Sequence, residues 1–223
     1  MAERYSQRAF TPPPGATEIV LIRHGASADA VPGVPFALVD GHGDPPLSPA
    51  GEAQARAVAG RLAAEPLAAL FVTGLTRTVQ TAAPLAERLG MEPVVVPGLR
   101  EVKLGDWEGG EFRIRAQTGD PVAVRAVAEE RWDVIPGAET MEALAERVRR
   151  GIEEIVETTG PDASAAAVLH GGIIGEVCRQ ATGSRPFAFV HSDNCSLSRL
   201  VVLPDGRRLL RTFNDTAHLN GSG

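Results

Sequence analysis

Short apolar runs alternate with longer amphipathic stretches along this chain. An unbroken apolar run such as EIVLIR (18–23) is typical of a strand that is buried on both faces, because no position of such a strand meets water. The sequence Pro204-Asp205-Gly206 is a hairpin turn signal between two further apolar runs. The predicted strands span residues 18–23, 67–73, 92–97, 165–170, 196–203 and 207–213.

The amphipathic stretches predict helices at residues 48–65, 75–90 and 139–160, with a further helical piece at 122–132. Ser48 and Pro49 suit the N-cap and first turn of the first helix. In the second, Pro84 predicts a bend or a division, and Gly90 a C-terminal cap. The third places one apolar face at three- and four-residue steps, made of Met141, Leu144, Val148, Ile152, Ile155 and Val156.

Alternating strands and helices predict an α/β fold with a largely parallel sheet and helices on both faces. Ligands bind outside the carboxyl ends of the strands in such sheets. The sequence Arg23-His24-Gly25 follows the first predicted strand, and His170-Gly171-Gly172 follows a later one. We therefore expect the two histidines in the same crevice.

The domain organisation is read from length and from proline content. Residues 1–16 contain Pro12-Pro13-Pro14-Gly15 and are expected to be a loose tail. The 223-residue chain is otherwise long enough for one α/β domain with a sizeable core, which we assign to residues 17–223.

Composition narrows the function classes. A net charge of −6 and a pI near 5.4 argue against a general nucleic-acid binder, although a pocket can be locally positive. There is no 18-residue apolar run and no apolar stretch of a secretory signal, so neither a membrane partner nor secretion is expected. Cys178 and Cys195 are expected to be reduced, buried thiols of a cytoplasmic protein rather than a disulfide.

Four segments carry a family resemblance: LIRHGAS (21–27), GLTRTVQTA (74–82), LREVKLGDWEG (99–109) and VLHGGIIGEV (168–177). Taken in this order, they resemble the histidine phosphatase superfamily, the phosphoglycerate-mutase-like proteins of branch 1. The resemblance covers roughly residues 17–220. It implies a three-layer α/β/α sandwich with a mostly parallel central sheet, and chemistry through a phosphohistidine.

The resemblance implies that His24 is the nucleophile. A neutral imidazole suits this role because it avoids repulsion by an anionic phosphomonoester. Cationic groups must hold the phosphoryl oxygens where charge spreads in the transition state, and Arg23 and Arg77 match those positions. His170 would add a donor, and Glu101 would give a proton to the leaving oxygen.

Small residues around these positions are also expected in the site. Gly25, Gly171 and Gly172 would let backbone N–H groups approach the phosphate. The Ser27 hydroxyl would either contact the phosphate or cap a turn, and both alternatives stay open. His42 is expected near the entrance, while Trp107 is expected to pack under its loop and His218 to hold the C-terminal segment.

The chain departs from the family pattern at three positions. Many relatives carry asparagine where this chain has Ala30, glutamate where it has Ala26, and arginine where it has Gly175. No asparagine occurs before Asn194, so one phosphate contact is missing or supplied differently.

We therefore predict a metal-independent phosphatase, without a cofactor, that hydrolyses a small phosphorylated metabolite through a phosphohistidine. His42, His191 and His218 match no metal-ligand spacing. A bisphosphoglycerate-dependent phosphoglycerate mutase is the alternative, disfavoured because its extra basic segments are replaced by scattered arginines at 113, 115, 125 and 131. A non-catalytic phosphate-binding module is a third hypothesis, and a homodimer is a further expectation.

Overall fold

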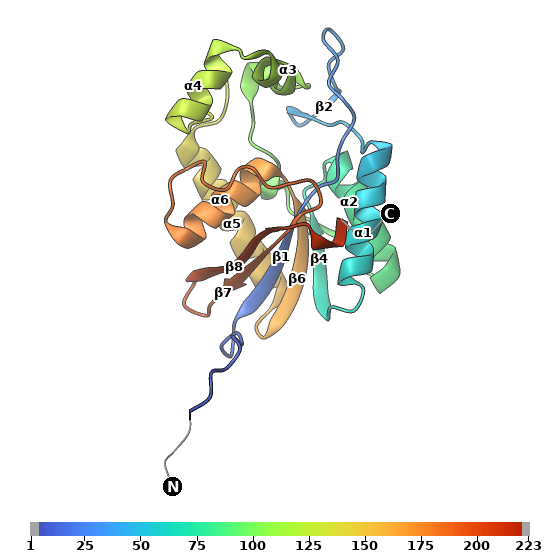
Figure 1. The fold of residues 1–223 in the computed structure, drawn as a ribbon, viewed down its shortest axis with the longest axis vertical. Helices are drawn as coiled ribbons and strands as arrows, with labels where there is room; N and C mark the ends of the chain where they lie inside the picture. The colour runs from blue at the N-terminus through green and yellow to red at the C-terminus, as the bar shows by residue number, and fades with distance from the viewer. Residues whose placement is uncertain (1–4, 220–223) are drawn as a thin grey trace.

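The computed structural model describes residues 5–219 and contains a six-stranded sheet between two layers of helices (Figure 1). The strand order is β5-β4-β6-β1-β7-β8. The first four strands in this order are parallel, while β7 and β8 run antiparallel to their neighbours. The strands are β1 (Thr17–Arg23), β4 (Leu67–Val72), β5 (Val94–Val95), β6 (Ala163–Leu169), β7 (Leu197–Val202) and β8 (Arg208–Asp215).

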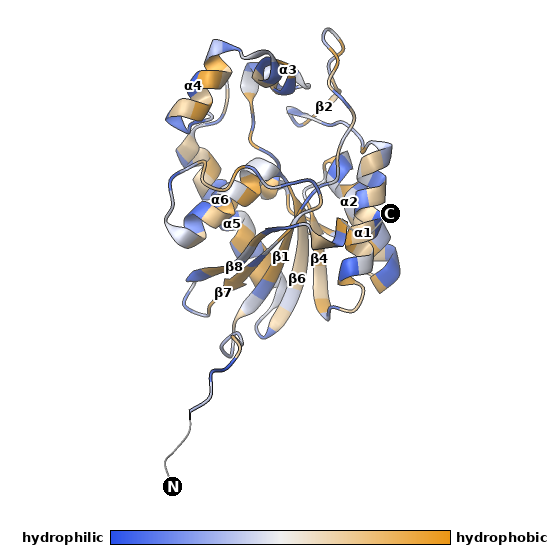
Figure 2. Ribbon diagram, in the orientation of Figure 1, coloured by the Kyte–Doolittle hydropathy of each residue, from blue (hydrophilic) through white to orange (hydrophobic). Residues whose placement is uncertain are grey.

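Helices cover both faces of this sheet. On one face, α1 (Pro49–Leu62) and α2 (Thr76–Leu89) pack through residues such as Leu62 and Leu85. On the other, α5 (Met141–Thr159) and α6 (Gly171–Thr182) pack through residues such as Ile152 and Ile174. The central strands are among the most apolar parts of the ribbon (Figure 2). The predicted three-layer α/β/α class is confirmed.

The capping signals in the sequence act as predicted. The Ser48 hydroxyl accepts from the Gly51 N–H at the start of α1, and Pro49 is the first helical residue. Gly90 ends α2 in the left-handed conformation, with φ 65°. The division predicted at Pro84 is absent, because α2 is one uninterrupted helix from Thr76 to Leu89. A proline removes only one backbone hydrogen bond, and the helix tolerates that loss here.

Other predicted bounds need correction. The strand expected at 92–97 is only two residues long, since β5 is an edge strand and a 3₁₀ turn, η1 (Pro97–Leu99), follows it. The helical piece expected at 122–132 is α4 (Pro121–Glu129), which ends at Glu130 in the left-handed conformation. Elements that were not predicted are α3 (Glu111–Thr118), α6 and the hairpin of β2 (Leu38–Val39) and β3 (His42–Gly43).

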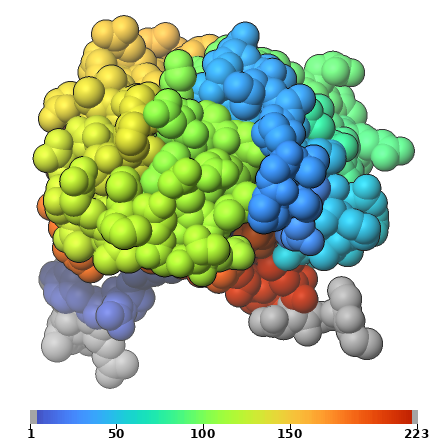
Figure 3. Space-filling view, turned by 90° about the horizontal axis from the view of Figure 1, so that it is seen from above, coloured from blue at the N-terminus to red at the C-terminus, as the bar shows by residue number. Residues whose placement is uncertain are grey.

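Two segments form a cap over the carboxyl ends of the strands: residues 28–43, with β2, and residues 105–132, with η2 (Gly105–Trp107), α3 and α4 (Figure 1). They lie against each other when the molecule is seen from above (Figure 3). The Phe36 N–H donates to the Gly109 carbonyl at 2.9 Å, and the Gly43 N–H donates to Glu108 at 2.7 Å. The cap is therefore one unit made of two distant parts of the chain.

The described part of the N-terminal tail has neither helix nor strand, but it is attached to the domain. The Phe10 ring lies 3.7 Å from the Arg211 guanidinium, and the Gly15 N–H donates to Asp162 at 2.6 Å. Residues 1–4 of the predicted tail and 220–223 of the predicted domain lie outside the described residues.

The two cysteines are free and buried, as predicted, and burial raises the pKa of each thiol to about 12. None of the helices between residues 5 and 219 has the length and apolar character needed to cross a membrane.

Candidate active site

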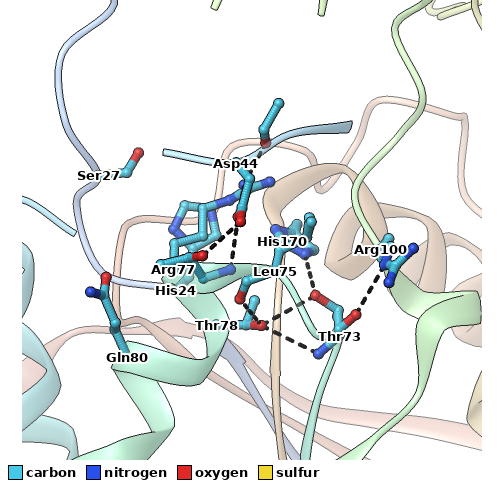
Figure 4. A network of polar contacts seen from close by, with 12 residues as sticks. His24, Ser27, Asp44, Thr73, Leu75, Arg77, Thr78, Gln80, Arg100 and His170 are labelled. Carbon is cyan, nitrogen blue, oxygen red and sulfur yellow. Dashed lines mark hydrogen bonds and ion pairs between the residues drawn. The ribbon is translucent and has the colours of Figure 1, made fainter. Parts of the chain in front are cut away.

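Adjacent strands bring the two predicted histidines together. β1 and β6 are parallel with Arg23 opposite Leu169, so His24 and His170 each follow the same level of the sheet. The His24 N–H donates to the Leu169 carbonyl at 3.0 Å, and the two imidazole centroids lie 5.2 Å apart. Thr73 follows β4, the other neighbour of β6, and completes a row of polar side chains (Figure 4).

His24 is buried and electrically neutral. Burial and the charge of Arg77 lower the pKa of its imidazole well below 6.5, and Arg23 lowers it further. Its Nδ1 lies 2.8 Å from the Gly25 carbonyl oxygen, which can only accept, so Nδ1 carries the proton. The lone pair of the neutral ring therefore resides on Nε2, the atom that is free to act as a nucleophile.

His170 lies deeper than His24 and is completely buried. Its Nε2 is 2.9 Å from the Thr73 hydroxyl, while its Nδ1 is buried without a hydrogen-bond partner. Burial, followed by the charge of Arg77, lowers the pKa of this ring as well. The structure thus supplies a second neutral imidazole beside the first, held by a threonine that the sequence analysis did not single out.

Arg77 lies in the first turn of α2, and its position depends on Asp44. Leu75, the N-cap residue, has no side chain that could cap the helix, and Asp44 accepts instead from the Thr76 N–H and hydroxyl at 2.7 and 2.6 Å. Arg77 Nη1 donates to the Gly43 carbonyl at 2.9 Å and stays 3.9 Å from Asp44 (Figure 4).

Arg23 is the second guanidinium at the strand ends. Its Nη1 donates to the Ser192 carbonyl, and its Nε is buried with no hydrogen-bond partner. No carboxylate of the described residues lies within ion-pair distance of Arg23. The guanidinium is therefore held in place with its charge unneutralised.

Glu101 is half-buried in the cavity wall, and Gly172 makes room for it. One carboxylate oxygen accepts from the Val102 N–H at 2.9 Å, and the other lies 3.4 Å from the Gly172 nitrogen. A Cβ at position 172 would approach the Glu101 oxygen to 2.7 Å. The glycine at position 172 therefore lets the Glu101 and Val102 side chains pack closely against the start of α6.

The two other carboxylates of the same loop are placed differently. Asp106 is exposed and lies outside the cavity wall. Glu108 lines the cavity, but its two oxygens accept from the backbone N–H groups of Gly43 and Leu104. Glu108 therefore connects the two parts of the cap.

The small residues around His24 have roles that differ from the expected ones. The Gly25 N–H donates to the Thr81 hydroxyl at 3.0 Å, so it does not point to a phosphate site as expected. A Cβ on Gly25 would lie 2.6 Å from the Gly51 carbonyl oxygen, so this glycine allows α1 to pack closely. Gly171 begins α6. A Cβ built on this residue would lie 3.4 Å from Arg23 Nε.

Ser27 does not line the cavity. Its hydroxyl accepts instead from Arg113 Nη2 at 2.6 Å, a contact that was not among the two expected roles. Asn194, the first asparagine of the chain, donates to the His24 carbonyl at 2.9 Å and holds the backbone at this position.

His24, the neighbouring strand ends and the cap surround a cavity of about 220 Å³. The strand ends and neighbouring loops provide its polar wall, with Arg23, His24, Arg77, Glu101 and Gly172. The cap provides most of its aromatic wall, with Phe36, Trp107, Phe112 and Trp132. His42 lines the cavity as expected, and Trp107 is also a buried packing residue, 4% exposed, against Ala123 and Ile135.

Arg113, Asp44 and Thr73 belong to the site although the sequence analysis gave them no role. Arg113 lines the cavity from α3, where it was one of several scattered arginines. No local signal distinguishes it, because its place depends on how the cap docks. No local sequence signal distinguishes Asp44 or Thr73 either. Asp44 acts by capping α2 at Thr76, and Thr73 acts by contacting His170.

The donor set suits an anion. Within residues 5–219, no group of three or more His, Cys, Asp or Glu side chains is arranged to hold a metal ion. Three guanidiniums instead line the cavity, together with Gly172 of the first turn of α6, whose N–H is directed at the Glu101 carboxylate. A neutral imidazole facing such a set can attack a phosphoryl group whose charge the guanidiniums neutralise.

Comparisons with known sequences agree with this chemistry. Residues 19–216 match the histidine phosphatase superfamily, branch 1. A bifunctional protein of Mycobacterium tuberculosis is 32% identical over 206 residues, which cover 91% of this chain and 55% of that protein. Phosphoglycerate mutase-like protein 4 of Arabidopsis thaliana is 30% identical over 212 residues, covering 92% and 88%. The chain thus spans about half the length of the mycobacterial relative.

The fold is shared with solved structures. A mycobacterial glucosyl-3-phosphoglycerate phosphatase superposes with a TM-score of 0.72 at 27% identity, and the match covers 90% of this chain and all of that one. Structures of that phosphatase include complexes with VO₃ and with inorganic phosphate.

Proposed function

Since this chain belongs to the histidine phosphatase superfamily, branch 1, we propose that it is a phosphatase that hydrolyses a small phosphorylated metabolite through a phosphohistidine at His24. The observation that carries the proposal is the state of that imidazole. It is neutral, its Nδ1 proton is bound by the Gly25 carbonyl, and Nε2 is the basic atom beside two guanidiniums.

In the first step, His24 Nε2 attacks phosphorus. The N–P bond forms as the P–O bond to the alcohol breaks, and Glu101 gives its proton to the leaving oxygen. Arg23 and Arg77 hold the phosphoryl oxygens while charge spreads over them, which makes their positive charge more effective in the transition state than in the ground state.

In the second step, water attacks the phosphohistidine. The Glu101 carboxylate takes a proton from the water, the N–P bond breaks, and inorganic phosphate leaves with the imidazole again neutral. The guanidiniums supply the positive charge throughout, so we expect activity to survive treatment with a metal chelator.

The composition of the cavity favours a phosphatase over a mutase. A phosphoglycerate mutase must grip the carboxylate of a three-carbon acid while the phosphoryl group is returned to it. Beyond the guanidiniums at positions 23, 77 and 113, the described lining contains no arginine or lysine. Phe36, Phe112 and Trp132 give much of the cap-side wall an apolar surface, which offers no partner to a second anionic group.

A rapid-quench experiment tests the proposal. The purified chain is mixed with a ³²P-labelled phosphomonoester, and acid-labile, base-stable phosphate is expected on His24. A panel of phosphorylated metabolites then identifies the best substrate. Faster conversion of 3-phosphoglycerate in the presence of bisphosphoglycerate than hydrolysis of any panel member would instead favour the mutase. Phosphate binding without turnover of any phosphomonoester would indicate a non-catalytic module.

A further inference from the structure

Arg113 reaches from the cap into the wall of the cavity. It lies in the first turn of α3, and its guanidinium is fixed on one edge by two hydrogen bonds to the segment after His24. Nη1 donates to the Ala28 carbonyl at 2.9 Å, and Nη2 donates to the Ser27 hydroxyl at 2.6 Å. The side chain lines the same cavity as His24 and Arg77.

Arg113 forms no ion pair with a carboxylate of the described residues. Arg115, two residues along the same helix, pairs with Glu111 at 2.7 Å and with Asp120 at 2.8 Å. For Arg113, no carboxylate in the described part of the chain is within ion-pair distance. Burial lowers the pKa of its guanidinium and the charge of Arg23 lowers it further, while the more distant carboxylates of Asp29 and Glu101 offset part of this shift.

Two like charges are thus held near each other in one cavity. Arg23 has an unpaired buried Nε, and Arg113 keeps N–H groups beyond the two that bind Ser27 and Ala28. Repulsion between unpaired guanidiniums is unfavourable in the empty site, and a bound dianion removes it. Such an arrangement favours an anion that contacts both.

We propose that Arg113 is a third guanidinium that binds the transferring phosphoryl group, and that Ser27 is the residue that positions it. The inference rests on the proposed function, since it assigns a further contact in the same step. It also accounts for Ala30. Arg113 on α3 supplies the phosphate contact that many relatives make with an asparagine at that position. The site is then complete only when the cap is docked on the strand ends.

The Arg113→Gln variant tests this contact directly. We expect the dissociation constant of orthovanadate, measured by calorimetry, to rise by about 10- to 100-fold, as for the loss of a charge-assisted hydrogen bond. The value of kcat/KM should fall by about 10²–10³-fold for aryl and alkyl phosphates alike, because the phosphoryl group is common to both. Arg125→Gln removes one exposed arginine from α4 and is the matched control, expected to behave as the wild type.

Two milder variants separate binding from folding. Arg113→Lys retains the charge without the planar fork and should weaken vanadate binding by several-fold. Ser27→Ala frees one edge of the guanidinium and should have a smaller effect of the same kind. If all three variants bind vanadate as the wild type does, the inference is wrong.

A different pattern would also overturn it. Normal vanadate affinity in Arg113→Gln, with losses confined to substrates that carry a second anionic group, would make Arg113 a contact of the leaving group. Failure of the proposed function remains distinguishable, because vanadate binding is read without turnover. If the wild type binds vanadate but hydrolyses no phosphomonoester, the proposed function is wrong. The vanadate affinities of Arg113→Gln and Arg125→Gln then still decide whether Arg113 binds the anion.

Discussion

At the carboxyl ends of β1, β4 and β6, the residues of the site follow directly on hydrogen-bonded strands, whereas those of the cap stand on short helices and loops. His24 is fixed through its backbone to the neighbouring strand. In the cap, α3 has no buried residue, and α4 buries only Ala123 and Ala126 while Val124 and Val127 remain exposed. The cap therefore has few contacts to restrain it, compared with the sheet.

This difference separates most of the proposed chemistry from selection of the substrate, with Arg113 as a proposed phosphoryl contact that lies on the cap. Groups that must meet the reacting phosphorus with small tolerance belong on rigid elements, while surfaces that contact the rest of the substrate can be looser. Substitutions at the strand ends should consequently affect all phosphomonoesters, and substitutions in the aromatic part of the cap should change the preference among them.

The largest effect is expected at His24. His24→Ala removes the nucleophile, so kcat should fall by about 10⁴-fold or more for every substrate, with no phosphoenzyme on rapid quench. The exposed His191→Ala is the control and should retain activity. Near-normal turnover in His24→Ala would contradict the assignment of the strand ends to chemistry.

Glu101→Gln should have the next largest effect, and one that depends on the leaving group. An alkoxide needs the proton that Glu101 supplies, so hydrolysis of an alkyl phosphate should slow by about 10²–10⁴-fold. An activated aryl phosphate leaves without that proton and should slow much less. Steady-state rates for the two classes of ester measure the difference.

The neighbouring carboxylates provide the controls. Asp106→Asn changes an exposed side chain outside the cavity and should be nearly silent. Glu108→Gln should lower the melting temperature, because the carboxylate accepts from the Gly43 N–H in the other cap segment and from the Leu104 N–H in its own loop. An equal loss for good and poor leaving groups in Glu101→Gln would indicate a positioning role, and a larger alkyl-specific loss at Asp106 or Glu108 would move the proton donor.

The strand ends should also dominate the response to acid. His24 and His170 have pKa values well below 6.5 in the folded state, so between those values and 6.5 the unfolded chain binds more protons. Their contribution to stability is complete above pH 6.5 and is lost as the pH falls below it. The free energy of unfolding should decrease by about 1.4 kcal/mol per pH unit for each histidine.

Urea titrations between pH 7 and 5, in buffer without phosphate, measure this slope. His170→Asn removes one of the two groups and should reduce the slope by about half, whereas the half-buried His218, whose pKa is lowered mainly by burial, adds a smaller contribution. A free energy of unfolding that stays constant from pH 6.5 to 5 would show that the two imidazoles are not held neutral by the fold.

The smallest effect is expected in the aromatic wall of the cap. Phe112→Leu removes a ring that lies 5.8 Å from Trp132, so kcat/KM for an aryl phosphate should fall by about 5- to 10-fold. A small polar alkyl phosphate should be hydrolysed at an unchanged rate. Val124→Ala, on the exposed face of α4, is the control. Equal losses for both esters would mean that the cap and the strand ends act on substrates in the same way.

The strand ends could be predicted from sequence because their information is local. An apolar run that stops at Arg23, and another that stops before His170, define both the strand and the residue that follows it. Parallel pairing then places these positions at one edge of the sheet. Arg77 and Glu101, which also line the cavity, were singled out in the same way, through segments adjacent to predicted strands.

The cap could not be predicted to the same depth because its positions depend on contacts between distant segments. α3 buries no side chain, so it leaves no apolar periodicity in the sequence. Each strand of the β2–β3 hairpin is two residues long, and its place is fixed by hydrogen bonds to the loop around Glu108. Arg113 was therefore seen only as one arginine among several, although the structure brings it into the same cavity as His24.

The central position of β1 has a consequence for biosynthesis. β1 precedes the other strands of this sheet in the chain, yet both of its neighbours, β6 and β7, begin only at Ala163 and Leu197 (Figure 1). The segment that carries His24 must wait, unpaired and apolar, until residues 163–202 emerge. A nascent chain or truncated product that stops before β6 contains His24 but not the strand that fixes it, so the site at the strand ends should form only after β6 and β7 have been synthesised.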